Sequence, residues 1–236
     1  MIKFKRVVLK ISGEILGGRE GIGIDMKTVD YIVEEVVKAH ELGAELGIVV
    51  GGGNFIRGSK VATKGLERVN SDRLGMISTI LNSITLSDTL ISRNIDSVVL
   101  SAIPVEGIAE KYSVEKAIEY LNKKYIVIFA GGTGNPFFST DTSAVLRAAE
   151  IEADVVLKAT KVDGIFDKDP MKYPNAKKFE EITSNEVLTK NLKVMDLTAF
   201  SLSCESKIPI IVFNLMEKDC IKRAILGEKI GTLVKV

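Results

Sequence analysis

The chain has 236 residues, 46% of them hydrophobic, which suits one large α/β domain or two small lobes that share a sheet. Its net charge of +1 gives no attraction for a polyanion, so we expect no nucleic-acid partner. We expect a cytoplasmic protein with no membrane partner and no structural disulfide. The reasons are that the chain has only two cysteines and that we see neither a leader nor an apolar run near the ~20 residues of a membrane helix.

Apolar, β-branched runs alternate with amphipathic stretches along the whole chain. Because this alternation is typical of strands joined by crossover helices, we expect a three-layer αβα sandwich around a mostly parallel sheet. In such a fold a ligand binds at the carboxyl ends of the strands. The expected strands cover residues 4–11, 45–50, 96–102, 125–130, 154–159, 210–213 and 232–236.

Helices are expected where a capping side chain precedes an amphipathic stretch. Asp25, Ser113 and Asp219 are expected caps, and either Thr140 or Asp141 is expected to cap the helix that follows them. Two short helices are expected near 184–188 and 197–204. The long helix expected at 71–92 has five side chains along one side, namely Leu74, Ile77, Leu81, Ile84 and Thr85.

Three glycine-rich loops follow predicted strands directly, at residues 12–23, 51–58 and 131–141. A glycine after a strand often marks only a tight turn, which is the ordinary explanation for any one of these loops. Three such loops at one edge of a parallel sheet favour a second explanation, because glycine lets backbone N–H groups approach a phosphate. The sequence therefore predicts a nucleotide-phosphate site at this edge.

Two lysines interrupt apolar strands, and both are candidates for stabilising a phosphoryl group during its transfer. Lys10 and Lys158 each lie within a β-branched run, where a charge is costly without a partner. Asp141 could hold and orient them, or it could simply cap a helix. No Gly-x-x-x-x-Gly-Lys-Ser/Thr motif is present, and no Gly-x-Gly-x-x-Gly follows the first strand, which excludes a P-loop and a dinucleotide fold.

Other candidate residues also have a simpler explanation. Arg57 follows three glycines, where a guanidinium could reach a phosphate, but it could also be a surface charge. Asp72 is expected to cap a helix, although a carboxylate there could accept hydrogen bonds from ligand hydroxyls. His40, the only histidine, is expected to be structural. No metal-ligand spacing is visible, so Mg²⁺ would be held mainly through substrate phosphates.

Four segments together resemble the amino acid kinase family over essentially the whole chain: residues 10–13, 51–58, 131–141 and 158–164. Within that family, residues 133–140 (Thr-Gly-Asn-Pro-Phe-Phe-Ser-Thr), 101–104 and 193–196 are similar to UMP kinases of bacterial type. The resemblance implies a kinase that converts ATP and UMP into ADP and UDP in pyrimidine nucleotide synthesis, with Mg²⁺, as a homohexamer. It also implies a UMP-binding and oligomerisation lobe at about residues 1–150 and an ATP-binding lobe at about 151–236.

The resemblance further implies roles for individual residues. Lys10 and Lys158 would stabilise the transferring group and Asp141 would organise them, with Lys193 as an alternative second cation. The implied ATP-binding residues are Lys10, Ile11, Ser12, Gly13, Gly53 and Arg57 at the phosphates, and Thr160, Phe166 and Asp169 at the adenosine. The implied UMP-binding residues are Gly52, Asp72, Thr133, Gly134, Asn135, Pro136, Phe137, Phe138, Ser139 and Thr140.

The family resemblance also implies an effector segment. Gly18, Arg19, Glu20, Gly21, Ile22 and Gly23 match the segment implicated in activation by GTP, and UTP is the usual feedback inhibitor. Two other functions stay open. One is a nucleotide-binding regulatory protein without turnover, against which the two strand lysines and Asp141 argue. The other is a kinase of a small carboxylate or carbamate, which would need a different acceptor loop at 133–140.

Overall fold

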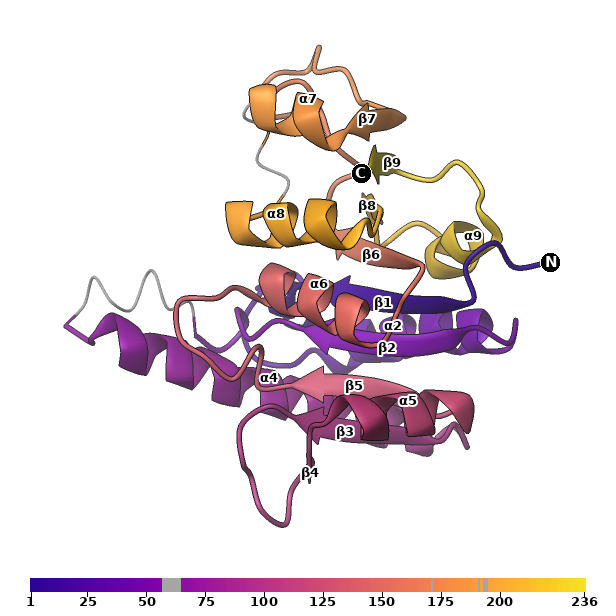
Figure 1. The fold of residues 1–236 in the computed structure, drawn as a ribbon. Helices are drawn as coiled ribbons and strands as arrows, with labels where there is room; N and C mark the ends of the chain where they lie inside the picture. The colour runs from indigo at the N-terminus through magenta and orange to yellow at the C-terminus, as the bar shows by residue number, and fades with distance from the viewer. Residues whose placement is uncertain (57–64, 171, 191, 193–194) are drawn as a thin grey trace.

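One central sheet runs through the molecule, and helices cover both of its faces (Figure 1). The structure is a computed structural model that describes residues 1–56, 65–170, 172–190, 192 and 195–236. The strands are β1 (Arg6–Ile11), β2 (Glu45–Val50), β3 (Ser97–Ser101), β4 (Glu110–Lys111), β5 (Ile126–Ala130), β6 (Val155–Thr160), β7 (Glu181–Thr183), β8 (Ile210–Asn214) and β9 (Thr232–Lys235). The helices are α1 (Gly13–Leu16), α2 (Met26–His40), α4 (Arg68–Ile91), α5 (Val114–Asn122), α6 (Thr140–Glu150), α7 (Ser184–Thr189), α8 (Leu197–Ser206) and α9 (Cys220–Leu226).

The strands form a single sheet in the order β4-β3-β5-β2-β1-β6-β8-β9-β7. Paired strands run parallel in every case except β8 and β9, which are antiparallel. The long β-branched runs put β1, β2, β5 and β6 at the centre, where both faces are covered. The predicted αβα sandwich with a mostly parallel sheet is therefore confirmed.

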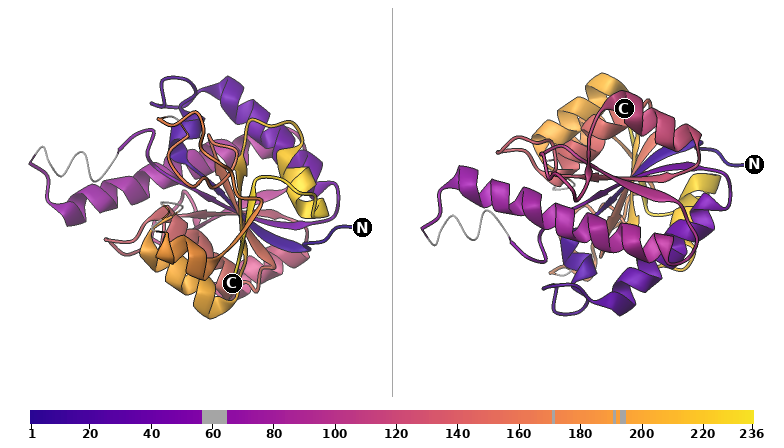
Figure 2. Two further views of the ribbon diagram at one scale, coloured as in Figure 1. Left: turned by 90° about the horizontal axis from the view of Figure 1, so that it is seen from above. Right: turned by 90° about the horizontal axis from the view of Figure 1, so that it is seen from below.

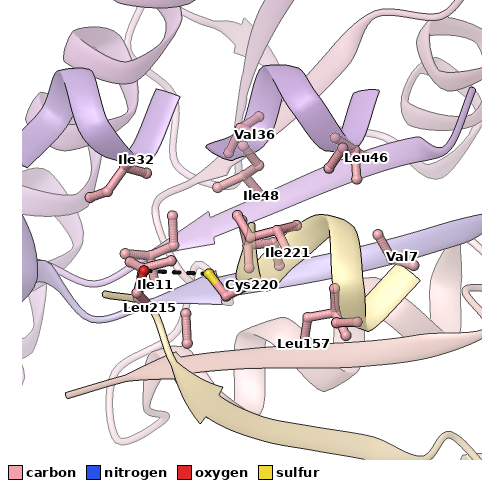
Figure 3. Packing of buried hydrophobic residues seen from close by; sticks show 14 of the residues in the cluster. Val7, Ile11, Ile32, Val36, Leu46, Ile48, Leu157, Leu215, Cys220 and Ile221 are labelled. Carbon is pink, nitrogen blue, oxygen red and sulfur yellow. Dashed lines mark hydrogen bonds between the residues drawn. The ribbon is translucent and has the colours of Figure 1, made fainter. Parts of the chain in front are cut away.

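Successive strand residues point to opposite faces of the sheet, and this alternation creates two hydrophobic cores. On one face, Val7, Leu9 and Ile11 of β1 pack with the apolar sides of α2 and α9 (Figure 3). On the other face, Val8 packs with α6 residues such as Ala148. The two views of Figure 2 show these two helix layers on either side of the sheet.

The side of α4 that the sequence pattern picked out faces outward. Ile77 and Leu81 are 48% and 47% exposed, whereas Thr79, Asn82 and Ser83 are buried. These three buried side chains are hydrogen-bonded, as Ser83 is to the Thr79 carbonyl oxygen at 2.7 Å, and such bonds let the inner side hold small polar residues. Contrary to expectation, α4 has the length and composition of a membrane-spanning helix. Half of its most apolar window is buried in the fold, which is typical of a core helix.

Helix caps agree with the sequence in part. Asp25 caps α2 by accepting a hydrogen bond from the Thr28 amide at 3.2 Å, and Ser113 caps α5 in the same way. The cap of α6 is neither Thr140 nor Asp141 but the preceding Ser139. Asp219 precedes α9 in a left-handed conformation, without a capping hydrogen bond from its side chain.

Three short elements were not predicted. The strands β4 and β7 have two and three residues, and α1 has four, so none is long enough to show a hydrophobic period. Both strands lie at the outer edges of the sheet. Pairing with a neighbouring strand, rather than local sequence, therefore makes them extended.

A pair of leucine substitutions tests how the cores are assigned. Leu46 of β2 is 1% exposed, so Leu46→Ala should lower the free energy of unfolding by about 2–5 kcal/mol, because it leaves a cavity. Leu188 of α7 is 47% exposed, and Leu188→Ala should cost less than about 1 kcal/mol. Urea unfolding followed by circular dichroism measures both values. Equal losses of unfolding free energy at the two positions would contradict the assignment of Leu46 to the core.

Candidate active site

Lys10 and Lys158 lie side by side at the centre of the sheet, because β1 and β6 pair in parallel with these two residues in register. Their neighbours Leu9 and Ile11 face α2 and α9, so alternation turns both lysines toward α6. Each lysine is only 8% exposed. The sheet thus brings two cations to one buried point, where they need an anionic partner.

Asp141, in the first turn of α6, is that partner. Its Oδ1 atom lies 2.8 Å from Lys10 Nζ, and its Oδ2 accepts a hydrogen bond from Lys158 Nζ at 2.5 Å. Burial raises the pKa of Asp141, but the two lysines outweigh burial and hold this pKa below its usual value. Burial also lowers the pKa of Lys158, an effect that Asp141 opposes and Lys10 reinforces.

The three side chains form a cluster with one carboxylate and two ammonium groups. Both carboxylate oxygens of Asp141 are engaged, so this residue orients the lysines and is poorly placed to take up a proton. The excess positive charge suits an anion such as a phosphoryl group. Lys193, the alternative second cation, lies outside the described residues, and Lys158 is the one that the geometry pairs with Lys10.

The glycine-rich loops after β1 and β2 touch through their backbones. A Cβ atom on Gly13 would lie 2.3 Å from the Gly51 carbonyl oxygen. A Cβ on Gly52 would lie 2.6 Å from the Gly75 carbonyl oxygen of α4. Side chains at Gly13 and Gly52 would therefore separate the loops from each other and from α4. Close packing explains these two glycines, whatever else the loops bind.

A cavity of about 750 Å³, called here the larger cavity, opens on the β6 side of the cluster. Of the predicted residues, those that line it are Lys10, Ser12, Lys158, Thr160, Phe166 and Asp169. Ile11 is 0% exposed with its side chain in the core, so only its backbone could meet a ligand. Gly13 is held in the loop contact described above, and Arg57 lies outside the described residues.

A second cavity of about 110 Å³, called here the smaller cavity, lies between α4 and the loop at 131–139. Of the predicted residues, Gly52, Asp72, Thr133, Asn135, Phe138 and Thr140 line it, together with Gly53, which the resemblance assigned to ATP. The cavity lining does not include Gly134, Pro136, Phe137 or Ser139. Ile56 and Gly132, from two of the predicted glycine-rich loops, line it as well. Sequence reasoning missed the remaining lining residues, Ser71, Gly75, Met76 and Thr79, because they belong to the inner side of α4, which the hydrophobic pattern did not identify.

Asp72 does not cap a helix, contrary to the first expectation. The helix α4 begins at Arg68 with Glu67 before it, which puts Asp72 in its second turn. Its carboxylate accepts a hydrogen bond from the Phe137 amide at 2.8 Å and pairs with Arg68 Nε at 2.8 Å. Asp72 therefore ties α4 to the loop at 131–139, at the edge of the smaller cavity.

Ser139 acts at the start of α6 rather than in the cavity. Its hydroxyl accepts hydrogen bonds from the amides of Asp141 at 3.0 Å and Thr142 at 3.2 Å. The same hydroxyl donates to Asp196, which also accepts from Thr142 Oγ1 at 2.9 Å and from the Ala199 amide of α8 at 2.9 Å. Asp196 thereby joins the beginnings of α6 and α8. Only its position before an amphipathic stretch could have signalled this role.

The glycine-rich segment at 18–23 lies beside the loop after β2. The Asn54 side chain donates to the Gly23 carbonyl oxygen at 2.6 Å, and the Gly23 amide donates to the Asn54 carbonyl oxygen at 2.9 Å. Asn54 and Asn82 exchange hydrogen bonds of 2.9 and 2.7 Å, and Asn82 also donates to the Gly51 carbonyl oxygen at 2.7 Å. A buried polar chain thus links the segment to the central loops. Sequence reasoning missed both asparagines, whose only signal was an amide side chain within a helix and a glycine loop.

The described part of the chain holds no group of three or more His, Cys, Asp or Glu side chains that could enclose a metal ion. Mg²⁺ can instead bind through a nucleotide's phosphates with few protein ligands. The larger cavity, with its lysines and Asp169, fits that arrangement and not a metal cage made by protein alone.

Comparisons with known proteins agree with this arrangement. Residues 5–214 match the model of the amino acid kinase family. A uridylate kinase of Escherichia coli (strain K12) is 48% identical over 231 residues, which cover 98% of this chain and 96% of that protein. A UMP kinase structure from Bacillus anthracis has a TM-score of 0.95 at 38% identity, covering 98% of this chain and 96% of that one.

A UMP kinase structure from Ureaplasma parvum is similar to the same extent, with a TM-score of 0.93 at 37% identity, and covers 98% of this chain and 99% of that one. Family model, full-length relative and solved structures all span the strands and loops that carry the lysine–aspartate cluster. The chain therefore belongs to the amino acid kinase family.

Proposed function

We propose that the chain transfers the γ-phosphoryl group of ATP to UMP and releases ADP and UDP, a step of pyrimidine nucleotide synthesis. Its place in a kinase family and its likeness to uridylate and UMP kinases support an enzyme of this type. One observation carries the chemistry. Both lysines of the cluster of Lys10, Asp141 and Lys158 line the larger cavity, and Thr140, the residue before Asp141, lines the smaller one.

The larger cavity is the proposed ATP site. Its volume of about 750 Å³ is within the range of ligand pockets, about 300–1,000 Å³. Its lining includes Lys10 and Ser12 from β1 and the loop after it, and Thr160, Phe166 and Asp169 from the end of β6 and the segment that follows. Phosphates next to the lysines and adenosine near Phe166 would match this distribution of charged and apolar residues.

The smaller cavity is the proposed UMP site. At about 110 Å³ it is too small for a nucleotide, so we expect the loop at 131–139 to move when UMP binds. The rings of Phe137 and Phe138 are 65% and 50% exposed, and little packing opposes such a movement. Asp72 would then exchange its bonds to Arg68 and the Phe137 amide for hydroxyls of UMP.

The reaction joins a phosphate oxygen of UMP to the γ-phosphorus while the bond from that phosphorus to the oxygen kept by ADP breaks. A phosphate monoester is largely ionised at pH 7, with a second pKa of about 6, so its oxygen attacks without a general base. This requirement agrees with Asp141, which is held deprotonated between two lysines. Lys10 and Lys158 would stabilise the negative charge on the transferring group. Mg²⁺ on the ATP phosphates would supply further positive charge.

We divide the roles between two lobes that share the sheet. The lining residues of the smaller cavity all fall between 52 and 140, and most of those of the larger cavity fall between 158 and 212. This distribution supports a UMP-binding lobe at about 1–150 and an ATP-binding lobe at about 151–236. Both cysteines are free thiols, which supports a cytoplasmic location.

We also propose that GTP activates the enzyme through residues 18–23 and that UTP inhibits it. The hydrogen-bonded path from Gly23 through Asn54 and Asn82 to Gly51 supports an effect of this segment on the central loops. Its Ile22 side chain is 76% exposed and free to meet an effector.

The outer stripe of α4 supports the proposed homohexamer. Ile77, Leu81 and Ile91 are 48%, 47% and 55% exposed along one side of the helix. Its first turns project beyond the sheet in both views of Figure 2, where a second copy could cover them. Burial of this stripe would favour association by the hydrophobic effect.

A substrate comparison tests the proposed reaction. Purified chain with ATP and Mg²⁺ should form ADP when UMP is added, in an assay coupled to ADP, with GTP raising the rate and UTP lowering it. ADP formation with a small carboxylate or carbamate, and none with UMP, would reject UMP as acceptor. An unchanged rate with GTP would reject only the proposal that GTP activates the enzyme, and would leave the proposed reaction standing.

Lys158→Ala tests the role of the cluster. Because charge stabilisation in the transition state is lost, kcat should fall about 10²–10³-fold, while ATP binding, measured by calorimetry, should weaken far less. Lys123→Ala removes a lysine that is 58% exposed in an ion pair with Glu119, and it should leave kcat unchanged. Equal effects of the two substitutions would contradict the assignment.

Leu81→Glu tests the assembly. A charge on the outer stripe of α4 should give a smaller particle than the unaltered chain in light scattering, because burying an unpaired carboxylate is costly. Leu188→Glu, at an equally exposed leucine of α7, should leave the mass unchanged. A monomeric unaltered chain, or a Leu81→Glu variant of full mass, would overturn the proposal.

A further inference from the structure

One hydroxyl on the inner side of α4 is buried without a hydrogen-bond partner. Ser71 lies at the end of the first turn of the helix and is 0% exposed. Its Oγ atom has no partner among the described residues. A buried hydroxyl of this kind has lost its hydrogen bonds to water and gained none in the protein, which is costly. Its presence therefore needs an explanation.

Other buried serines of α4 satisfy their hydroxyls within the helix. Ser78 donates to the Leu74 carbonyl oxygen at 2.8 Å, and Ser83 donates to the Thr79 carbonyl oxygen at 2.7 Å. Each of these bonds reaches back one turn of the helix. Ser71 makes no such bond within the described part of the chain, so its hydroxyl keeps its hydrogen-bonding capacity for a ligand.

Ser71 lies on the side of α4 that lines the smaller cavity. Residues 71, 72, 75, 76 and 79 all line it, and this spacing places them on one face of the helix. Gly75 follows Ser71 by one turn, and a Cβ atom built on it would meet nothing within 4 Å. Helical side chains tilt toward the N-terminus, so the space that Gly75 leaves extends toward Ser71. The Ser71 side chain is thus next to unfilled space on the cavity side of the helix.

A buried, unsatisfied hydroxyl can also be a packing defect without a function. Ser143 of α6 is the comparison within the same chain, because it is 0% exposed and its Oγ also has no partner among the described residues. Ser143 lines neither the larger nor the smaller cavity. The position of Ser71 beside the proposed acceptor site is what distinguishes the two serines.

The groups that line the smaller cavity with Ser71 suit the sugar and phosphate of a nucleotide. Gly52 and Gly53 belong to a loop whose glycines let backbone approach a phosphate, and Asp72 is the proposed partner of ligand hydroxyls. An ionised carboxylate only accepts hydrogen bonds, whereas a serine hydroxyl both donates and accepts. Ser71 therefore offers this site a neutral donor, which Asp72 cannot supply.

We propose that Ser71 is a further acceptor-binding residue, whose hydroxyl forms a hydrogen bond with the ribose phosphate of the acceptor nucleotide. The enlargement of the smaller cavity that admits the acceptor brings this hydroxyl into contact with it. The same group then lowers stability in the ligand-free chain and adds affinity in the complex. This role rests on the proposed function for the identity of the acceptor.

Ser71→Ala tests the proposal, because it removes the hydroxyl and keeps a good helix former. The dissociation constant of UMP, measured by calorimetry, and the KM for UMP should each rise about three- to tenfold, as expected for one lost hydrogen bond. The KM for ATP should change less than about twofold. The melting temperature of the ligand-free variant should rise by about 2–4 °C, because an unsatisfied buried group is removed.

Ser143→Ala is the matched control. It removes the other unsatisfied buried hydroxyl, so it should raise the melting temperature in the same way and change neither KM. Ser71→Cys is a second variant of nearly equal size, and its thiol is a weak donor, so it should weaken UMP binding in the same direction.

2′-Deoxy-UMP identifies the atom that Ser71 meets. If the bond goes to the ribose 2′-hydroxyl, Ser71→Ala should weaken binding of the deoxynucleotide less than about twofold. If the bond goes to the phosphate or the 3′-hydroxyl, the three- to tenfold loss should remain.

An unchanged UMP dissociation constant in Ser71→Ala would overturn the proposal and leave Ser71 a packing defect like Ser143. Equal rises of the KM values for UMP and ATP would also overturn it, because they indicate a general distortion. An unaltered chain that binds UMP without forming UDP would reject the proposed reaction, while the dissociation constants would still decide the role of Ser71. An unaltered chain that does not bind UMP would reject both.

Discussion

Two buried lysines in register on neighbouring strands need a carboxylate between them, and much of the molecule follows from this requirement. Asp141 can reach both Lys10 and Lys158 only if α6 begins directly above the carboxyl ends of β1 and β6. The chain leaves the sheet at the carboxyl end of β5, two strands away from β1, so the loop at 131–139 must pass the carboxyl end of β2 before α6 starts. Ser139 then caps the helix and leaves the Asp141 carboxylate to the lysines.

Hydrogen bonds outside the lysine–aspartate cluster hold the rest of the site in place. Asn82 and Thr79, on the inner side of α4, bond to the loops after β2 and β5, and Asp196 joins α6 to α8. Thr79 and Asn82 are buried and all three side chains are hydrogen-bonded, so they favour one arrangement of the loops over the alternatives that glycine would allow. The charged cluster can thus remain fixed while the exposed rings at 137 and 138 are free to move.

Sequence reasoning succeeded where one element carries its own signal. The β-branched runs around Val8 and Val156 predicted central strands, and the glycines after them predicted the loops of the site. It failed on α4, because hydrophobic periodicity assumes an apolar interior, whereas Thr79 and Asn82 face inward to bond with loops. Adjacent Ser, Thr and Asp residues at 139–141 are equally good caps by propensity, and only the lysines decide between them. The roles of Asn54 and Asp196 depend on partners far along the chain, which no local pattern contains.

The two sides of α4 serve different purposes on one rigid rod. Its inner side carries Asp72 and Thr79 at the smaller cavity, and its outer side carries Ile77 and Leu81 in solvent. Because both sides belong to one helix, the proposed packing between copies at the outer stripe would bear on the same element that lines the smaller cavity. Ligand binding in that cavity and the proposed assembly would then be coupled through α4.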